Sequence, residues 1–293
     1  MSKNIKAHLA LFSVNLIYAL SFGFSKDVMN GYIPAFTFIL FRVLGATALF
    51  WVLFFKTEKI QPRDYIKFAI AGVFGVAANQ LMFFEGLDHT STINASIIMV
   101  NTPILVLIFS SILLKERISS RKILGVLIGL IGAVSLILFK DSSIKNDATL
   151  YGDLFIFLNA SSYALYLVLV KPLMKKYSPY TVIKWVFTFG LIYVIPFGMS
   201  QFGETNFDMT SDIILKVIFI IIFTTFLTYL LTMYGLNKVS PTTVSSYVYL
   251  QPLLTTAIAL ILGFEQPTWT NLLCGIIIFI GVYLVSFKPK YKR

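Results

Sequence analysis

Residues 92–114 read TINASIIMVNTPILVLIFSSILL, an uncharged run of 23 residues with Pro103 near its middle. About 20 consecutive apolar residues are long enough to cross the hydrocarbon core of a bilayer as an α-helix. An interior proline removes one helical hydrogen bond and bends the helix axis. The stretch therefore predicts a membrane-spanning helix that is broken near its centre.

Nine similar apolar stretches accompany this one. Together they predict ten membrane-spanning helices, at 8–25, 33–55, 66–86, 92–114, 122–139, 151–170, 179–200, 213–236, 242–264 and 268–287. Of the 293 residues, 57% are hydrophobic and only 13% are charged, against roughly 25% charged residues in soluble domains. This composition excludes a soluble enzyme domain, and the predicted fold class is an all-α polytopic membrane protein.

Positive charge is unevenly distributed between the loops. The loops on the same side of the membrane as the N-terminus hold 18 Lys and Arg residues, and the loops on the other side hold four. The remaining two, Arg42 and Lys184, lie within spans. Because cytoplasmic loops are enriched in Lys and Arg, the asymmetry predicts that both termini are cytoplasmic. The net charge of +11 then reflects topology and contact with lipid headgroups rather than nucleic acid. Lys184 lies close enough to the end of its span to reach the cytoplasmic surface.

The chain contains an internal repeat. Tyr18-Ala19-Leu20 recurs 145 residues later as Tyr163-Ala164-Leu165, and Pro103 recurs 149 residues later as Pro252. The two proline-broken helices therefore occupy equivalent places in the two copies, which extend over 1–140 and 151–287.

An odd number of spans in each copy determines how the copies are related. Five spans per copy require the second copy to enter the membrane upside down relative to the first. Such inverted repeats are typical of secondary transporters, which bind substrate near the midplane and open alternately to the two sides. A duplicated scaffold or a passive pore is the alternative interpretation.

Uncharged polar side chains surround the two predicted breaks. An amide exposed to lipid is costly, so these side chains should face the interior of the bundle and line a cavity. Hydrogen bonding between helices is the alternative role. The candidate substrate-binding residues are Tyr18, Asn79, Gln80, Asn101, Asn159, Tyr163, Tyr247 and Gln251.

Three charged residues complete the candidate site. Arg42 lies about nine residues into its span, roughly 13 Å deep, where an unpaired charge is costly. Glu85 and Asp153 lie at span ends on the outer side. Either carboxylate is a candidate partner for Arg42, a ligand for a substrate ammonium group, or the acceptor of a coupling proton. A purely structural ion pair is the alternative.

Catalytic and nucleotide-binding motifs are absent from the sequence. It has no G-x-x-x-x-G-K-[S/T] loop, no H-E-x-x-H, no G-x-S-x-G and no cysteine pair, since Cys274 is the only cysteine. We therefore expect a protein that is not an enzyme, uses no ATP, and holds no cofactor or metal ion. The glycine pattern Gly125-x-x-x-Gly129 with Gly132 predicts close packing against another helix.

Several stretches of the sequence match the pattern of a known family: Gly86-Leu87, 92–96, Thr102-Pro103-Ile104, 114–119, Gly125 and 129–132. On these stretches the sequence resembles the EamA-type carriers of the drug/metabolite transporter superfamily over nearly its whole length. This resemblance implies a basket of ten helices in two inverted repeats, located in a cell (inner) membrane, and export of amino acids or related small metabolites. It also maps the family's acidic positions to Glu116 and Glu265 and its basic position in the second helix to Arg42.

Two other functions remain open at this stage. One is an uptake or facilitative permease for nucleosides or sugars, in which the same helices would move a different substrate in a different direction. The other is a membrane scaffold or receptor without transport. Flux measurements on variants of Asn101 and Gln251 would separate these alternatives, because a scaffold tolerates their loss.

Overall fold

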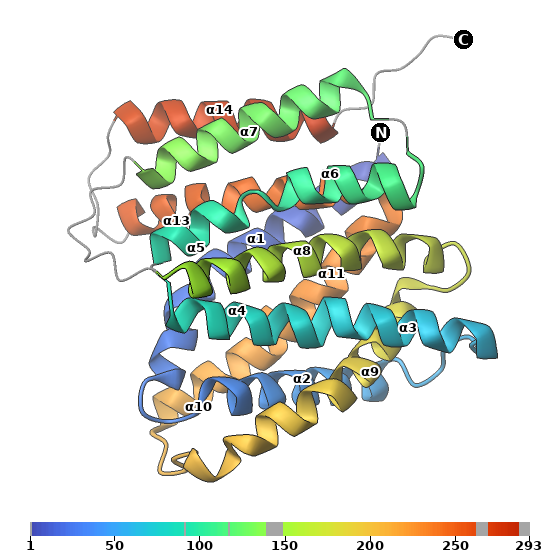
Figure 1. The fold of residues 1–293 in the computed structure, drawn as a ribbon, viewed down its shortest axis with the longest axis vertical. Coiled ribbons are helices and arrows are strands. Elements are labelled where there is room, and N and C mark those ends of the chain that lie inside the picture. The colour runs from blue at the N-terminus through green and yellow to red at the C-terminus, as the bar shows by residue number, and fades with distance from the viewer. Residues whose placement is uncertain (1, 91, 117, 139–148, 262–268, 287–293) are drawn as a thin grey trace.

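Helices make up all the regular structure in the part of the chain described by the computed structural model. That part comprises residues 2–90, 92–116, 118–138, 149–261 and 269–286, and it contains no β-strand. The helices form one bundle, and most of them run across the view in Figure 1. The predicted all-α architecture is confirmed for these residues.

The helix bounds follow the predicted apolar stretches closely. The first half contains α1 (Ser2–Met29), α2 (Ala35–Leu53), η1 (Pro62–Asp64), α3 (Tyr65–Gly72), η2 (Val73–Ala77), α4 (Ala78–Asp88), α5 (Thr92–Met99), α6 (Thr102–Leu113) and α7 (Ser120–Leu138). The second half contains α8 (Leu150–Leu173), α9 (Pro179–Ser200), η3 (Phe202–Glu204), α10 (Ser211–Phe219), η4 (Ile220–Leu227), α11 (Thr228–Lys238), α12 (Pro241–Ser246), η5 (Tyr247–Tyr249), α13 (Leu250–Ile261) and α14 (Trp269–Ser286).

Within the described residues, six helical stretches are long and apolar enough to cross a membrane. They are Ala35–Leu53, Pro62–Asp88, Ala95–Leu113, Leu150–Leu173, Pro179–Ser200 and Ser211–Lys238. Ile5–Ser21 and Leu272–Ser286 are shorter apolar helices. These stretches fit a polytopic membrane protein. The predicted span ends at 139, 262–264, 268 and 287 lie outside the described residues, as does Glu265.

Both predicted proline breaks are present. In the first half α5 ends at Met99 and α6 begins at Thr102, one residue before Pro103. The Thr102 hydroxyl donates a hydrogen bond of 2.6 Å to the Met99 carbonyl, which has lost its helical donor to the proline. In the second half the 3-10 segment η5, Tyr247–Tyr249, separates α12 from α13 just before Pro252.

Two π-helical segments were not predicted from the sequence. The segment η2 joins α3 to α4, and η4 joins α10 to α11. The two segments occupy corresponding places in the repeat, since a shift of 149 residues superposes Ala77 of the first on Phe226 of the second. A π-helical turn rotates the side chains that follow it and is frequent at functional sites. In this chain the residues that follow are the polar ones at the starts of α4 and α11.

The helices pack in pairs that repeat between the two halves. Helix α4 packs against α8 as α11 packs against α1, while α2 packs against α9 and α7 against α14. In Figure 1, α7 and α14 lie along one side of the bundle, α2, α9 and α10 along the opposite side, and α1, α8 and α11 between them. The central helices therefore carry the predicted polar residues Tyr18, Asn159 and Tyr163.

The contact between α7 and α14 depends on glycine. A Cβ atom added to Gly281 would lie 2.5 Å from the backbone nitrogen of Gly129, and one added to Gly125 would lie 2.9 Å from the Gly281 carbonyl oxygen. Because these neighbours are backbone atoms, they have no rotamer by which to move away. The predicted close packing of the glycine pattern is confirmed.

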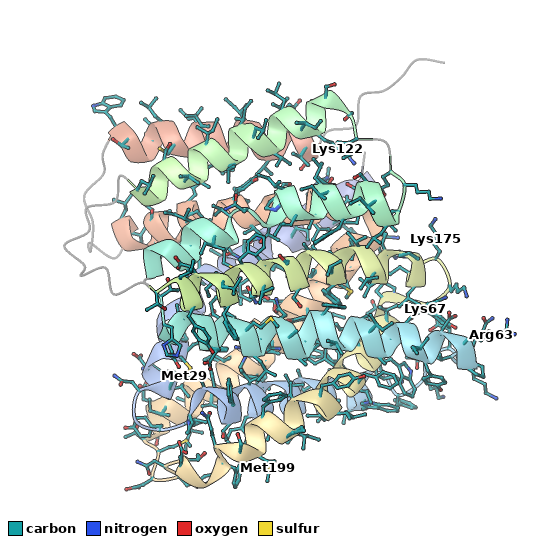
Figure 2. The ribbon with its side chains drawn as sticks, in the orientation of Figure 1. Met29, Arg63, Lys67, Lys122, Lys175 and Met199 are labelled. Atoms are coloured by element: carbon teal, nitrogen blue, oxygen red, sulfur yellow. The ribbon has the colours of Figure 1, made fainter. Side chains whose placement is uncertain are left out.

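One end of the bundle is basic. Figure 2 shows Arg63, Lys67, Lys122 and Lys175 at this end, and Met29 and Met199 far from it. Helix α1 begins and α14 ends at the same end (Figure 1). The basic loops of both halves therefore meet on one side, as a membrane topology with a single positive face requires.

Candidate substrate-binding site

A cluster of polar side chains is buried where the central helices meet α2 and α4. Its hydrogen-bonding groups come from both halves of the chain and include most of the predicted candidates. We call this set the central cluster: Tyr18, Arg42, Asn79, Gln80, Asn159, Tyr163, Thr224, Thr225 and Tyr229.

Arg42 provides the formal charge of the central cluster. Its side chain is only 8% exposed, and its guanidinium carbon lies 5.6 Å from the ring centre of Phe38 and 5.7 Å from that of Phe84. Its Nε donates a hydrogen bond of 3.1 Å to the hydroxyl of Thr225 on η4. The phenol groups of Tyr18 and Tyr229 interact with the guanidinium electrostatically. No carboxylate among the described residues pairs with Arg42.

Two hydroxyl groups, one from the cluster and one from a neighbouring residue, donate hydrogen bonds to backbone carbonyls of the π-helical segment η2. The Tyr229 hydroxyl donates to the Gly75 carbonyl at 3.0 Å, and the Ser162 hydroxyl donates to the Phe74 carbonyl at 2.7 Å. Side-chain hydrogen bonds of this kind help to satisfy backbone carbonyls where a helix is irregular within a membrane. These bonds attach the π-helical turn of the first half to α8 and α11 of the second.

Asn79 and Asn159 connect α4 to α8. The Nδ2 amide of Asn159 donates a close hydrogen bond to the Asn79 carbonyl, and the Tyr229 hydroxyl lies 3.4 Å from Oδ1 of Asn79. The ring of Tyr166 is 6.2 Å from that of Tyr163 and 6.4 Å from that of Tyr229. The cluster thus combines amide groups with a series of tyrosine rings.

Several polar atoms of the cluster are buried without a hydrogen-bond partner. Both amide atoms of Gln80, Oδ1 of Asn159 and the hydroxyl of Thr224 make no hydrogen bond, although each residue is at most 5% exposed. The Gln80 amide lies close enough to the Tyr229 hydroxyl for an electrostatic interaction, but the two groups do not have hydrogen-bond geometry. Each such atom costs about 1–3 kcal/mol of desolvation that the folded chain does not recover. Unpaired donors and acceptors at one buried place are what a polar ligand would satisfy.

Asn101 and Asp153 lie outside the central cluster. The Asn101 amide donates to the carbonyl of Ile97 on α5 at 2.9 Å. Together with Asp153 and Phe157, Asn101 lines a crevice of about 530 Å³ between α5, α6 and α8. Phe157 is 45% exposed, so the crevice opens on the outer surface of the bundle. The Asp153 carboxylate accepts a close hydrogen bond from the Thr90 hydroxyl.

Three further predicted residues also lie outside the cluster: Tyr247, Gln251 and Glu85. Tyr247 on η5 forms a hydrogen bond of 2.7 Å with Nδ1 of His8, and Gln251 is half-buried on α13. Glu85 accepts a hydrogen bond of 3.2 Å from the Tyr151 hydroxyl and lies 3.7 Å from Nε2 of His89. The structure therefore does not bring Glu85 to Arg42.

Lys184, the other embedded cation, differs from its expected position. It is 2% exposed and does not reach the surface. Its ammonium group donates to the Phe54 carbonyl at 3.0 Å and lies 4.3 Å from the ring centre of Trp51. The terminal nitrogens of Arg42 have no acceptor among the described residues, whereas the ammonium group of Lys184 has one within the protein, which explains why Lys184 stays inside the bundle.

Three members of the cluster, Thr224, Thr225 and Tyr229, were not among the predicted site residues. For Tyr229 the signal was the repeat itself, because a shift of 149 residues places Tyr229 opposite Gln80. Applying that shift to each predicted polar residue would have added Tyr229. Thr225 has no comparable signal, since it faces Arg42 through the π-helical turn of η4.

Comparison with known proteins agrees with this architecture. The family model described as the EamA-like transporter family matches residues 5–138 and again 150–287. An uncharacterized transporter of Archaeoglobus fulgidus is 28% identical over 97% of this chain and 99% of its own length, and one of Bacillus subtilis is 24% identical over 99% and 97%. A solved crystal structure with 18% identity superposes with a TM-score of 0.76, covering 95% of each chain, which shows a common fold. This chain is therefore a multi-pass membrane protein that belongs to the EamA-like transporter family.

Proposed function

We propose that this protein is a secondary transporter that exports amino acids or related small metabolites by alternating access. The observation that carries the proposal is the central cluster, where both halves of the chain bury polar atoms that have no partner within the protein. A scaffold has no need to bear that cost. In a transporter, the substrate supplies the missing hydrogen bonds.

The proposal includes ten membrane spans in two inverted repeats of five. Three observations support this arrangement: the family model matches the chain twice, the proline breaks recur in the two halves, and so do the π-helical segments. Two equivalent halves can exchange conformations, so that a site between them opens to one side and then to the other. Six of the nine cluster residues are buried in the present structure, and Tyr18, Asn79 and Tyr163 are partly buried.

Orientation follows from the distribution of charge. Placing the basic end of the bundle in the cytoplasm makes both termini cytoplasmic. Location in a cell (inner) membrane and the export direction rest on the resemblance to EamA-type carriers. Energy for export comes from a gradient, with the proton as the candidate coupling ion.

The proposed function is tested by metabolite analysis of cells and medium. Wild-type protein is compared with the double variant Tyr18→Phe/Tyr163→Phe, which removes two hydroxyl groups from the cluster and keeps the rings. We expect a metabolite to accumulate outside wild-type cells and to fall about tenfold in the variant, since a lost hydrogen bond costs about 0.5–1.5 kcal/mol each.

The matched control is Tyr193→Phe, which removes a hydroxyl from the outer surface of α9 and should leave export unchanged. Depletion of a compound from the medium would show that the protein takes up its substrate instead of exporting it. Identical metabolite profiles for cells with the wild-type protein, cells with the double variant and cells without the protein would contradict transport and favour a scaffold.

Glu85→Gln tests the coupling role of that carboxylate. Because Glu85 bonds to Tyr151 and His89 at the bundle surface rather than to the central cluster, we expect transport and its dependence on a pH gradient to change less than about twofold, as is usual for an exposed ion pair. The measurement is substrate flux in vesicles with and without an imposed pH gradient. Loss of the gradient dependence would instead assign proton coupling to Glu85.

A further inference from the structure

The balance of charge in the central cluster restricts what it can bind. Arg42 is buried, and no carboxylate among the described residues pairs with it. A guanidinium has five N–H donors, and only the one on Nε is used, by the hydroxyl of Thr225. The remaining donors belong to the planar fork that recognises carboxylates in a bidentate way.

An unpaired guanidinium at this depth is costly. Removing a charge from water costs several kcal/mol unless an opposite charge and further hydrogen bonds replace the solvent. The rings of Phe38 and Phe84, 5.6 and 5.7 Å from the guanidinium, offset only part of this cost. Lys184 shows the ordinary solution for a structural cation, because a backbone carbonyl accepts its hydrogen bond. The Arg42 fork has no such acceptor.

Polar atoms without partners accompany the unpaired charge. Thr224, next to the residue that Arg42 contacts, has a buried hydroxyl with no hydrogen bond, and so has the amide of Gln80, beside Tyr229. Tyr229 in turn interacts with Arg42. A fixed cation with free donors on either side is a site for an anion that has several acceptor atoms.

We propose that Arg42 binds a carboxylate group of the transported molecule, and that the substrates are therefore small organic acids, including amino acids, but not amines or other cations. This inference rests on the proposed transport function and specifies the substrate class of the same site. A single cation matches one carboxylate better than a phosphate ester, which requires several positive groups. Because the described cluster offers no carboxylate to an ammonium group, oxo acids and N-acylated acids should be carried as well as amino acids.

The test uses purified protein in liposomes that are loaded with a metabolite extract of the host cells. Mass spectrometry identifies every compound that leaves the liposomes, and equilibrium dialysis of the same extract identifies the compounds that bind. Wild-type protein is compared with Arg42→Gln, which removes the charge, and Arg42→Lys, which keeps the charge but not the fork. Lys184→Gln is the matched control, since it removes the other embedded cation. Size-exclusion chromatography checks that each variant is folded.

We expect the compounds carried by wild-type protein to be carboxylates. Arg42→Gln should weaken their binding at least about 30-fold, Arg42→Lys should give an intermediate loss, and Lys184→Gln should keep wild-type binding. Transport of amines or uncharged compounds alone would overturn the inference while leaving the transport function intact. Carboxylate binding as strong as that of the wild type in folded Arg42→Gln or Arg42→Lys would overturn it too. If nothing is bound or carried, the proposed function fails, and this inference fails with it.

Discussion

Replacing Gln80 with methionine is expected to reduce transport at least about tenfold and, at the same time, to make the protein more stable. Gln80 is 4% exposed, and neither of its amide atoms has a hydrogen-bond partner. Methionine has a similar length and no amide, so the substitution removes a desolvation cost of about 1–3 kcal/mol. Transport falls because the amide is no longer present to bind the substrate. Flux at equal membrane levels and thermal unfolding in detergent measure the two effects.

Gln201→Met is the matched control for this prediction. Oε1 of Gln201 accepts a hydrogen bond of 3.0 Å from the backbone nitrogen of Phe36, and neither residue belongs to the central cluster. The same substitution should therefore lower the stability there, because it leaves a backbone donor unpaired, and should leave flux close to wild type. If Gln80→Met instead destabilises the protein and preserves flux, Gln80 has a structural role.

Gly281→Ala is expected to have the largest effect on folding. The added Cβ would lie 2.5 Å from the Gly129 nitrogen and 2.8 Å from the Gly125 carbonyl oxygen, so α14 would have to move away from α7. Overpacking of this kind costs about 1–3 kcal/mol, and here the neighbours are backbone atoms that leave no local rearrangement. We expect a lower melting temperature and a lower yield of monodisperse protein, measured by thermal unfolding and size-exclusion chromatography.

Gly275→Ala provides the comparison on the same helix. Its Cβ would meet only the flexible side chain of Leu253, at 3.0 Å, so the variant should fold like the wild type. Equal stability of the Gly281 and Gly275 variants would show that the α7–α14 contact tolerates separation. The pair thus isolates close backbone packing from the general effect of adding a methyl group to α14.

Local properties of the sequence determined most of the helical framework. Runs of apolar residues set the helical stretches, because length and hydropathy decide which segments can enter a bilayer. Pro103 and Pro252 set the two breaks, since a proline removes a hydrogen bond wherever it stands in a helix. Gly125 and Gly129 indicated a close helix contact for the same local reason, the absence of a side chain. Each of these features can be predicted without knowing which helix packs against it.

The tertiary structure alone decided which polar side chains meet. Asn101 and Gln80 are both amides in apolar stretches, yet Asn101 bonds to the Ile97 carbonyl and lines an outer crevice, whereas Gln80 is buried in the central cluster. Arg42 meets Thr225 rather than the predicted carboxylates because the π-helical turn of η4 presents that hydroxyl to α2. The rotation of a helix about its axis depends on how neighbouring helices pack, and hydropathy carries no information about that rotation when almost every face is apolar.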